Sequence, residues 1–395
     1  MRLVSGCQKP GPGRVLHPVL VLLVLAALPL PAAYAECPAG TYPVGDYCPK
    51  YLIHVPDSWN GDLVVFAHGY QSPTEEPAIE DYAIPPGNQK VSEIIAGMGY
   101  AFAATSYSYT GLVIQQAVED VRELVRRFPD LSGRGSPRSV FLVGASEGGL
   151  VAALAIEKDP GLFDGGLAIC GPVGDFKKQV HYFGDFLVLF NYFFPNVLRN
   201  LSGTGETPTP EYVPEDLLQK WPQVAGAVLH AIGANPAAAK QLLKVSGAAV
   251  DPADPLSEQT ILGLLWYGIF ATNDANGKLG GCPYDNSRIW YSGSKNDIRL
   301  NLKIDRFRAD SAALENIENG YQTSGKLASP LVTLHTTKDP IVPYWHEPIY
   351  TLKTLLSGSL LRHLNIPVAR YGHCVFSPDE LVTAFALVRI MAEIY

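Results

Sequence analysis

The sequence lacks the signatures of a metal site, of a repeat protein and of a multi-span membrane protein. No Cys-x-x-Cys motif and no paired-histidine spacing occurs in its 395 residues, so a bound metal is not expected. Internal repeats and low-complexity tracts are missing as well. After the N-terminal region, no apolar stretch suggests a membrane-spanning helix. We therefore expect a chain that needs no metal and no other cofactor.

The N-terminal 35 residues are typical of a secretory signal peptide. A basic start precedes an unbroken apolar run over residues 19–28, and Ala33-Tyr34-Ala35 offers small residues for cleavage. The apolar run is shorter than the roughly 20 residues of a membrane-spanning helix, and the context of Cys37 does not favour lipid attachment. We expect a secreted or periplasmic protein with no stable membrane anchor after cleavage.

Positive charge is scarce in the remaining 360 residues (395 − 35). The leader carries three of the 30 basic residues and none of the 38 acidic ones, so the rest has a net charge of 27 − 38 = −11. This charge argues against nucleic acid as a partner. The length suffices for one large domain or for a core with an inserted cap. A small-molecule substrate is expected, and the oligomeric state is left open.

Cysteines are few, and export changes how they are interpreted. Cys7 leaves with the leader, and five cysteines remain. Cys37 and Cys48 flank a short segment rich in Pro and Gly, and a disulfide between them would stabilise the N-terminus by roughly 2–3 kcal/mol. Of the other three, Cys170, Cys282 and Cys374, at most two can pair within one chain.

The most informative segment of the chain is a Gly-x-Ser-x-Gly motif at residues 144–148. Four apolar residues suited to a buried strand precede it, and a stretch compatible with a helix follows over residues 150–158. This order is typical of a nucleophile elbow with Ser146 as the nucleophile. A structural strand-to-helix turn, whose serine caps the helix, is the alternative.

Strand and helix patterns alternate on both sides of this motif. Strands are predicted at residues 51–55, 63–67, 101–105, 139–143, 166–170, 331–335 and 368–371, and helices at 91–98, 113–128, 344–356 and 378–394. Between about residues 174 and 325 the alternation stops and several helical stretches appear. We expect an α/β fold with a mostly parallel sheet flanked by helices, and a mainly helical cap inserted after strand 6.

A catalytic serine requires a histidine and a carboxylate, and both stand after later predicted strands. His373 follows the last strand, and Asp339 lies just beyond the penultimate one. The order Ser, Asp, His and the position of all three at strand ends match what this elbow requires. His335 and His346 are weaker candidates for the base, and Asp175 is the rival carboxylate.

An oxyanion formed on attack needs backbone N–H donors. The amide of Glu147, the residue after the nucleophile, is one predicted donor. The second is expected in the loop His68-Gly69-Tyr70, at the amide of Tyr70 or, second, of Gln71. A plain turn is the alternative interpretation of this loop.

These motifs together resemble those of the α/β-hydrolase superfamily, in a serine esterase or lipase-like form with an inserted helical cap. The resemblance covers about residues 50–173 and 326–395. It implies Ser146, Asp339 and His373 as the catalytic triad, and Tyr70 and Glu147 as oxyanion donors. After the predicted signal peptide at 1–35, it implies a core in two parts at 36–173 and 326–395, and a cap or lid at 174–325.

The cysteine pattern departs from one branch of this superfamily. In tannases and feruloyl esterases of this type, cysteines directly before the serine and after the histidine form a disulfide. Here Cys374 follows His373, but Ala145 precedes Ser146, so that bridge cannot form. Cys374 is left to pair with Cys282 or Cys170, and we expect Cys282.

The predicted cap is rich in aromatic residues, which could line a substrate pocket or form the core of the cap. The pocket candidates are Phe183, Phe186, Phe190, Trp266 and Trp290, with Tyr267 and Tyr291 beside them. An apolar lid favours an uncharged ester. We therefore predict a carboxylic-ester hydrolase. The alternatives are a serine exopeptidase of the prolyl-oligopeptidase-like type and a non-catalytic binding protein on a hydrolase scaffold.

Overall fold

A computed structural model describes residues 37–395 of the chain. The predicted signal peptide at 1–35 lies outside the described residues, as does Cys7. Among the residues that are described, no helix is both long and apolar enough to cross a membrane.

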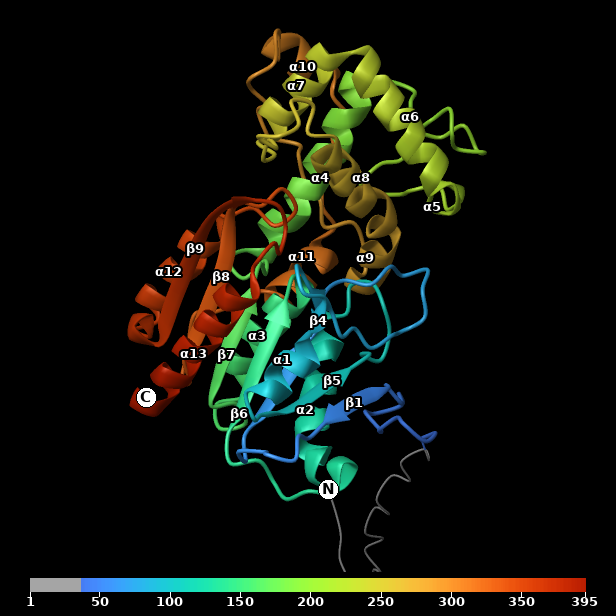
Figure 1. Ribbon diagram of the computed structural model, residues 1–395. Helices are drawn as coiled ribbons and strands as arrows, with labels where there is room; N and C mark the ends of the chain where they lie inside the picture. Colours follow the sequence, from blue (N-terminus) through green and yellow to red (C-terminus); the bar gives the residue numbers. More distant parts are fainter. Residues whose placement is uncertain (1–36) are drawn as a thin grey trace, which may run out of the picture. The chain divides into compact units, whose positions relative to one another are not determined.

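The centre of the fold is a seven-stranded sheet in the order β1-β5-β2-β6-β7-β8-β9 (Figure 1). β1 pairs antiparallel with β5, and the other neighbours run parallel. The mostly parallel sheet predicted above is thereby confirmed. Its strands are β1 (Tyr51–His54), β2 (Leu63–Ala67), β5 (Ala101–Thr105), β6 (Val140–Ala145), β7 (Gly165–Ile169), β8 (Leu331–Lys338) and β9 (His363–Tyr371).

Helices cover both faces of this sheet, which explains its continuous apolar strands. Successive residues of β2 point to opposite faces: Leu63 and Val65 join one apolar cluster with α2 and α3, whereas Val64 and Phe66 join another with α1 and α13. The covering helices are α1 (Val91–Gly97), α2 (Ile114–Ser132), α3 (Glu147–Lys158), α12 (His346–Leu356) and α13 (Pro378–Ile394).

The local sequence accounts for how the last helix begins. Pro378 occupies the first turn of α13, where no intrahelical N–H bond is lost. The Ser377 hydroxyl accepts from the Glu380 amide, and the Glu380 carboxylate accepts from the Ser377 amide. This capping box sets the start of the helix directly after the loop that carries His373.

Residues 174–325, called the helical insertion below, separate β7 from β8. They contain no strand and form α4 (Phe176–Phe193), α5 (Asp216–Gln219), α6 (Trp221–Ala234), α7 (Pro236–Ser246), α8 (Glu258–Phe270), α9 (Thr272–Leu279), α10 (Asp297–Lys303) and α11 (Ser311–Gly320). Within the main sheet the insertion follows the fifth strand in chain order and not the sixth, as was predicted, because β3 (Ala83–Ile84) and β4 (Gln89–Lys90) pair in a small sheet of their own.

The helical insertion has its own apolar core, with Phe186, Phe190 and Leu264 fully buried in it. Its last helix behaves differently, because Ile317 of α11 packs into the cluster that α2 and α3 form on the sheet. In Figure 1, α9 and α11 accordingly lie next to the sheet layer, whereas α6, α7 and α10 lie farther from it.

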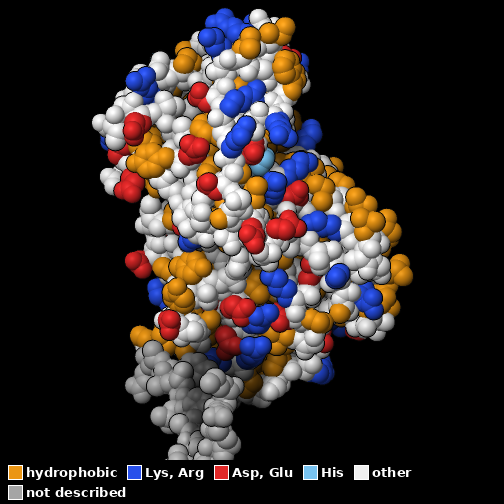
Figure 2. All heavy atoms as spheres, turned by 180° about the vertical axis from the view of Figure 1, so that it is seen from behind, with side chains coloured by type: hydrophobic (Ala, Val, Ile, Leu, Met, Phe, Trp, Pro, Cys, Tyr) orange, Lys and Arg blue, Asp and Glu red, His pale blue; other side chains and the backbone are white. Residues whose placement is uncertain are grey.

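The surface carries charges of both signs. On the face drawn in Figure 2, acidic and basic side chains are interspersed and do not gather by sign. The expectation that nucleic acid is not a partner stays a prediction.

Candidate active site

Ser146 stands at the sharp turn between β6 and α3. Its backbone has φ 57° and ψ −121°, and its amide donates to the Ile169 carbonyl on β7. Glycine is required on both sides of this turn. A Cβ on Gly144 would lie 1.9 Å from the Gly148 carbonyl oxygen, and a Cβ on Gly148 would lie 2.1 Å from the Ala67 carbonyl oxygen. The turn therefore holds the serine side chain beyond the end of the strand.

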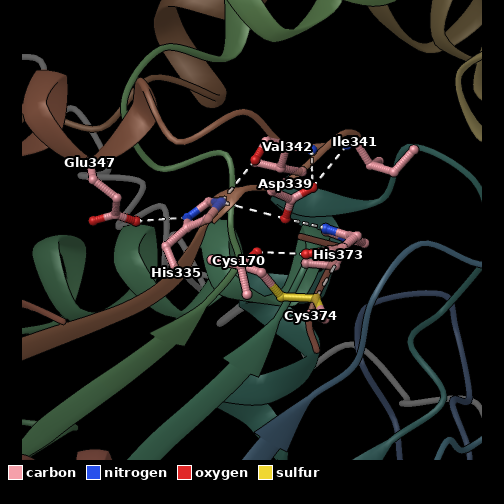
Figure 3. Close-up of a disulfide and its surroundings, with 11 residues drawn as sticks. Cys170, His335, Asp339, Ile341, Val342, Glu347, His373 and Cys374 are labelled. Carbon is pink, nitrogen blue, oxygen red and sulfur yellow. Dashed lines mark hydrogen bonds and ion pairs between the residues drawn. A yellow bond between two sulfur atoms is a disulfide. The ribbon is translucent and has the colours of Figure 1, made fainter. Parts of the chain in front are cut away.

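His373 and Asp339 are brought to this serine from the ends of β9 and β8. The Nε2 atom of His373 lies 2.9 Å from Ser146 Oγ. Its Nδ1 atom lies 2.7 Å from Oδ2 of Asp339, and both of these residues are labelled in Figure 3. The other carboxylate oxygen, Oδ1, accepts from the amides of Ile341 and Val342 at 2.8 and 2.9 Å. The three side chains predicted as a triad thus form one hydrogen-bonded chain.

The ionisation of Asp339, which is 2% exposed, determines which nitrogen of His373 carries a proton. Burial alone would raise the pKa of its carboxyl, but the adjacent His373 and His335 outweigh burial and hold that pKa below its usual value. A carboxylate can only accept, so Nδ1 of His373 donates to it. Nε2 is then free to accept from the Ser146 hydroxyl, as a general base requires.

The loop after β2 passes directly beside the serine. A Cβ on Gly69 would lie 3.2 Å from the Cβ of Ser146, so only glycine allows this approach without a shift. Tyr70, which follows, and Glu147, the first residue of α3, both border a cavity at Ser146. In the described part of the chain, neither backbone amide has a hydrogen-bond acceptor. Both predicted oxyanion donors therefore flank the serine with free N–H groups, and their function stays a prediction.

Buried aromatic packing holds this loop in place. The His68 ring stacks on the Tyr107 ring with centroids 3.9 Å apart, and the Tyr107 hydroxyl donates to the His68 carbonyl at 3.0 Å. Burial lowers the pKa of His68 to about 4, so its ring is neutral near pH 7. His68 thus has a structural place in the loop beside the serine.

The acid nearest to Ser146 along the chain carries little charge. The Glu147 side chain is buried and accepts from the Val113 amide at 3.3 Å, and burial raises the pKa of its carboxyl to about 8. Asp274, on α9, accepts from the Leu112 amide at 2.7 Å and pairs with Lys278 at 2.7 Å. Glu147 is thus the acidic side chain that borders the cavity at Ser146, with its Oε2 atom unpartnered among the described residues and a raised pKa that favours the neutral form.

Two cavities of different size meet at Ser146, and both are bordered by Tyr70 and Tyr267. The smaller, of about 120 Å³, lies between the sheet edge and the helical insertion. The larger, of about 800 Å³, extends along the sheet toward α1 and α13 and is bordered by His373. Both are lined mainly by apolar side chains.

The aromatic residues proposed for a substrate pocket divide between wall, core and surface. Phe183 borders the smaller cavity and stacks on Tyr267 with ring centroids 4.8 Å apart. Trp266 lies one layer behind, with its ring edge against Tyr70 at 5.9 Å. Tyr267 borders both cavities.

Four of the five predicted pocket residues, Trp266 among them, border neither cavity. Phe186 and Phe190 are fully buried in the core of the insertion, because they lie farther along α4 than Phe183, where the helix packs against α7 and α8. Trp290 is 64% exposed. Aromatic composition alone does not tell which turn of a helix meets the site.

One of the two predicted disulfides is present, and the other is not. Cys37 and Cys48 are bridged, which confirms the N-terminal disulfide. The predicted Cys282–Cys374 bridge is wrong: Cys374 is bridged to Cys170, with Cα atoms 5.4 Å apart (Figure 3). Cys170 directly follows β7, which lies between the strands that lead to Ser146 and Asp339.

Cys282 lies elsewhere, as a free thiol in the core of the helical insertion. Among the described residues, the group of potential metal ligands at the site is Cys170, His373 and Cys374. Two of its three members are in the disulfide, so their sulfur atoms are not available as thiolates.

Comparison with known proteins gives one match to a family model, described as serine aminopeptidase (S33), over residues 112–246. The search among curated proteins returned no match. Among solved structures, the Pyrococcus horikoshii acylaminoacyl peptidase aligns at 11% identity and a TM-score of 0.43, over 88% of this chain and 40% of its own. The chain thus spans about two fifths of that peptidase.

Two further solved structures align over more of their own length. Feruloyl esterase B from Aspergillus oryzae aligns at 14% identity and a TM-score of 0.46, over 85% of this chain and 72% of its own. The monoacylglycerol lipase of Paleococcus ferrophilus aligns at 12% identity and a TM-score of 0.40, over 87% of this chain and 98% of its own. The sheet order and the turn at Ser146 are those of an α/β-hydrolase fold, and the matched family model covers residues 112–246 of it.

Proposed function

We propose that this protein is an exported serine hydrolase that cleaves carboxylic esters through an acyl-enzyme on Ser146. The observation that carries the proposal is the hydrogen-bonded chain from Ser146 through His373 to Asp339, with the amides of Tyr70 and Glu147 beside the serine. Such a chain supplies a base for the hydroxyl and donors for the oxyanion.

The reaction follows from these positions. Nε2 of His373 takes the Ser146 proton as Oγ attacks the ester carbonyl, and the amides of Tyr70 and Glu147 stabilise the oxyanion. Collapse of this intermediate breaks the bond to the alcohol oxygen, which receives the proton from His373. A water molecule, deprotonated by the same imidazole, then attacks the acyl group. Collapse of the second intermediate releases the acid and returns the proton to Ser146.

Ester cleavage is favoured over aminopeptidase activity by the charges around the serine. An aminopeptidase needs a negative group to hold the ammonium of its substrate. Glu147 is mostly protonated near pH 7, and Asp274 is already paired with Lys278. The family match to serine aminopeptidases makes an exopeptidase the second candidate. It would have to hold the ammonium at Glu147, whose buried carboxyl would first have to lose its proton.

Two features support the rest of the proposal. The disulfides Cys37–Cys48 and Cys170–Cys374 fit an oxidising compartment and hence export after cleavage of the predicted leader. The helical insertion supplies Phe183 and Tyr267 to the wall of the smaller cavity, which supports a role as a cap.

The test compares Ser146→Ala with Ser136→Ala, a matched change at an exposed loop serine. We expect Ser146→Ala to lower hydrolysis of 4-nitrophenyl esters about 10⁴-fold or more and to abolish labelling by a fluorophosphonate probe, with Ser136→Ala unchanged. Full turnover by pure Ser146→Ala protein, or a wild type that the probe does not label, would contradict the proposal. A wild type that cleaves aminoacyl anilides and not esters would establish the peptidase instead.

A further inference from the structure

The direction of proton transfer indicates which cavity at Ser146 holds the alcohol of the ester and which holds the acyl chain. When the tetrahedral intermediate collapses, His373 protonates the alcohol oxygen, so that oxygen must lie beside the imidazole. His373 borders the larger cavity and not the smaller. The alcohol therefore extends into the larger cavity. The acyl chain is left with the smaller one, next to Glu147.

The volumes then set the size of each half of the ester. The smaller cavity, about 120 Å³, is below the roughly 150 Å³ that accommodates benzene in a protein core, so it admits an acyl group of about two to five carbon atoms. The larger, about 800 Å³, lies within the range of roughly 300–1,000 Å³ typical of pockets for drug-sized ligands.

The lining of the larger cavity restricts the chemistry of the alcohol. Its walls include Met98, Leu381 and Phe385, and the cation at its rim, Arg370, is held by two hydrogen bonds to the Glu380 carboxylate at 3.0 and 2.9 Å. No charge is left to pair with a charged alcohol. We propose that the substrate is an ester of a short acyl group with a large, uncharged, apolar alcohol. This rests on the ester hydrolysis proposed above.

Two ester series test the assignment. With the alcohol constant, we expect kcat/KM to fall at least tenfold from 4-nitrophenyl butyrate to 4-nitrophenyl octanoate. With the acyl group constant, we expect it to rise at least tenfold from ethyl acetate to hexyl acetate, because each buried methylene contributes about 0.8 kcal/mol, a factor of roughly four. A preference for the octanoate, or equal rates across the acetates, would overturn the assignment.

Two variants separate the cavities. Phe183→Ala widens the smaller cavity and is expected to restore octanoate hydrolysis, whereas Leu381→Trp fills the larger one and is expected to slow hexyl acetate more than ethyl acetate. The opposite pattern overturns the assignment, and the wild-type series decides alone if a variant does not fold. Failure of ester hydrolysis itself would appear differently, as no turnover of any ester and no probe labelling.

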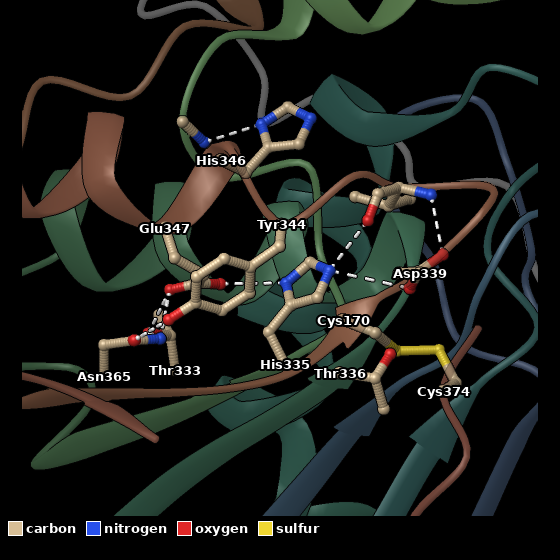
Figure 4. Close-up of polar contacts among 12 residues, drawn as sticks. Cys170, Thr333, His335, Thr336, Asp339, Tyr344, His346, Glu347, Asn365 and Cys374 are labelled. Atoms are coloured by element: carbon tan, nitrogen blue, oxygen red, sulfur yellow. Dashed lines mark hydrogen bonds and ion pairs between the residues drawn. A yellow bond between two sulfur atoms is a disulfide. The ribbon is translucent and has the colours of Figure 1, made fainter. Parts of the chain in front are cut away.

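A buried chain of polar groups continues from Asp339 away from His373 and carries an independent inference (Figure 4). The Nε2 atom of His335 lies 2.8 Å from the Val342 carbonyl oxygen and 3.5 Å from Asp339 Oδ2. Its Nδ1 atom lies 2.9 Å from Glu347 Oε1. Of these residues, His335 and Asp339 are 0% and 2% exposed, and Glu347 is 1% exposed.

The hydrogen bonds define the charge of this ring. The Val342 carbonyl only accepts, so Nε2 of His335 carries a proton. Oε2 of Glu347 is occupied by two donors, the Thr333 hydroxyl at 2.5 Å and the Asn365 amide at 2.7 Å, which leaves Oε1 to accept from Nδ1. A ring that donates from both nitrogens is a cation, and it lies between two carboxylates.

The titratable groups around this ring support the assignment. Burial opposes the charge, but hydrogen bonds to Asp339 and Glu347 outweigh it and raise the pKa of His335 to about 10. Tyr344 packs its ring edge against the imidazole with centroids 5.9 Å apart. His346 and His363, also nearby, have pKa values lowered by burial and add no cation.

We infer that His335, held by Glu347, is a positioning residue that places a positive charge beside Asp339 and fixes its Oδ2 atom toward His373. When this cation is removed, the Asp339 carboxylate stabilises the protonated form of His373 more strongly. The acidic limb of kcat/KM should then move to higher pH by about one unit. His335→Gln removes the positive charge and should move the limb, whereas Glu347→Gln removes a negative charge and leaves an acceptor for Nδ1, so it should not move the limb in this direction. Tyr344→Phe is the control and should leave it in place.

A purely structural role would lower the amount of folded protein without moving the limb, and that result would overturn the inference. If both variants fail to fold, the wild type still decides. Nitrogen-15 NMR of the histidine rings should show His335 doubly protonated at pH 8, and a neutral ring there would overturn the inference as well.

Discussion

The edge of the sheet and the helical insertion border the same small cavity, but they are built in different ways. The sheet edge places Ser146, Asp339 and His373 at the ends of three parallel strands, where hydrogen-bonded registers set their positions. The insertion contributes Phe183 and Tyr267 from helix faces, which are set by packing against other helices. The first arrangement supplies reactive groups and the second supplies shape. Changes in the two regions should therefore have different effects.

The largest expected effect lies at the sheet edge. Asp339→Asn should lower kcat about 10³–10⁴-fold, because an amide no longer holds the His373 ring in the required tautomer or stabilises its charged form. Asp175→Asn is the matched control, since this carboxylate lies at the start of α4, where it accepts from the Lys178 amide. Steady-state kinetics on one ester check both. Equal losses in the two variants would remove Asp339 from the triad.

The next effect contrasts the cysteines of the two regions. The bridge Cys170–Cys374 closes a separation of 204 residues, so the double variant Cys170→Ser/Cys374→Ser should lower the free energy of unfolding by about 4–5 kcal/mol. Activity should fall as well, because the bridge ties down the residue next to His373. Cys282→Ala, in the core of the insertion, should cost about 1 kcal/mol and leave activity nearly unchanged.

Guanidinium denaturation and ester kinetics measure both cysteine variants. Wild-type protein treated with a thiol reductant should behave like the double variant. A double variant with the wild-type activity would show that the histidine loop holds its position without the bridge.

Within the insertion, stability and specificity should separate between neighbouring aromatic residues. Phe186→Ala removes a fully buried ring and should destabilise the protein by about 3–5 kcal/mol. Phe183→Ala should cost less stability but should change the preference among acyl chains, because this ring borders the smaller cavity. Denaturation curves and the acyl series described above distinguish the two outcomes, and a swapped pattern would reverse the positions assigned to Phe183 and Phe186.

The same contrast explains what could be predicted from the sequence. Ser146, Asp339 and His373 follow apolar strands, and parallel strands bring their carboxyl ends to one edge, so pattern and chain order were enough to group them. The turn of α4 that meets the site could not be predicted, because Phe183, Phe186 and Phe190 share one side of the helix and differ in how far along it they lie. The prediction of Cys282 as the partner of Cys374 overlooked one signal, since Cys170 ends a predicted strand beside that of Ser146.

The contact between the buried side chains of His335 and Glu347 could not be predicted from the sequence either. The two residues are 12 positions apart, on β8 and α12, and their contact depends on how α12 packs against β9 and the sheet. Nothing in the local pattern distinguishes a histidine in that place from one that faces solvent.

The smallest expected effect is a dependence of the free energy of unfolding on pH, which arises in the sheet region. Folded His335 keeps its proton up to about pH 10, whereas an unfolded histidine loses it near 6.5, so between these values the folded state binds more protons. The free energy of unfolding should therefore fall as pH rises through this window, by at most about 1.4 kcal/mol per pH unit for one group. Glu147, with a folded pKa of about 8, adds a change of the same sign.

Denaturation midpoints at pH 6.5, 8 and 9.5 measure this slope, and the variant His335→Gln isolates the part due to the histidine. The variant should be less stable than the wild type at pH 6.5 but should lose less stability on going to pH 9.5, because it has no cation to give up. A variant with the wild-type slope would mean that the proton on His335 does not stabilise the fold, and the buried charge beside Asp339 would then be absent at neutral pH.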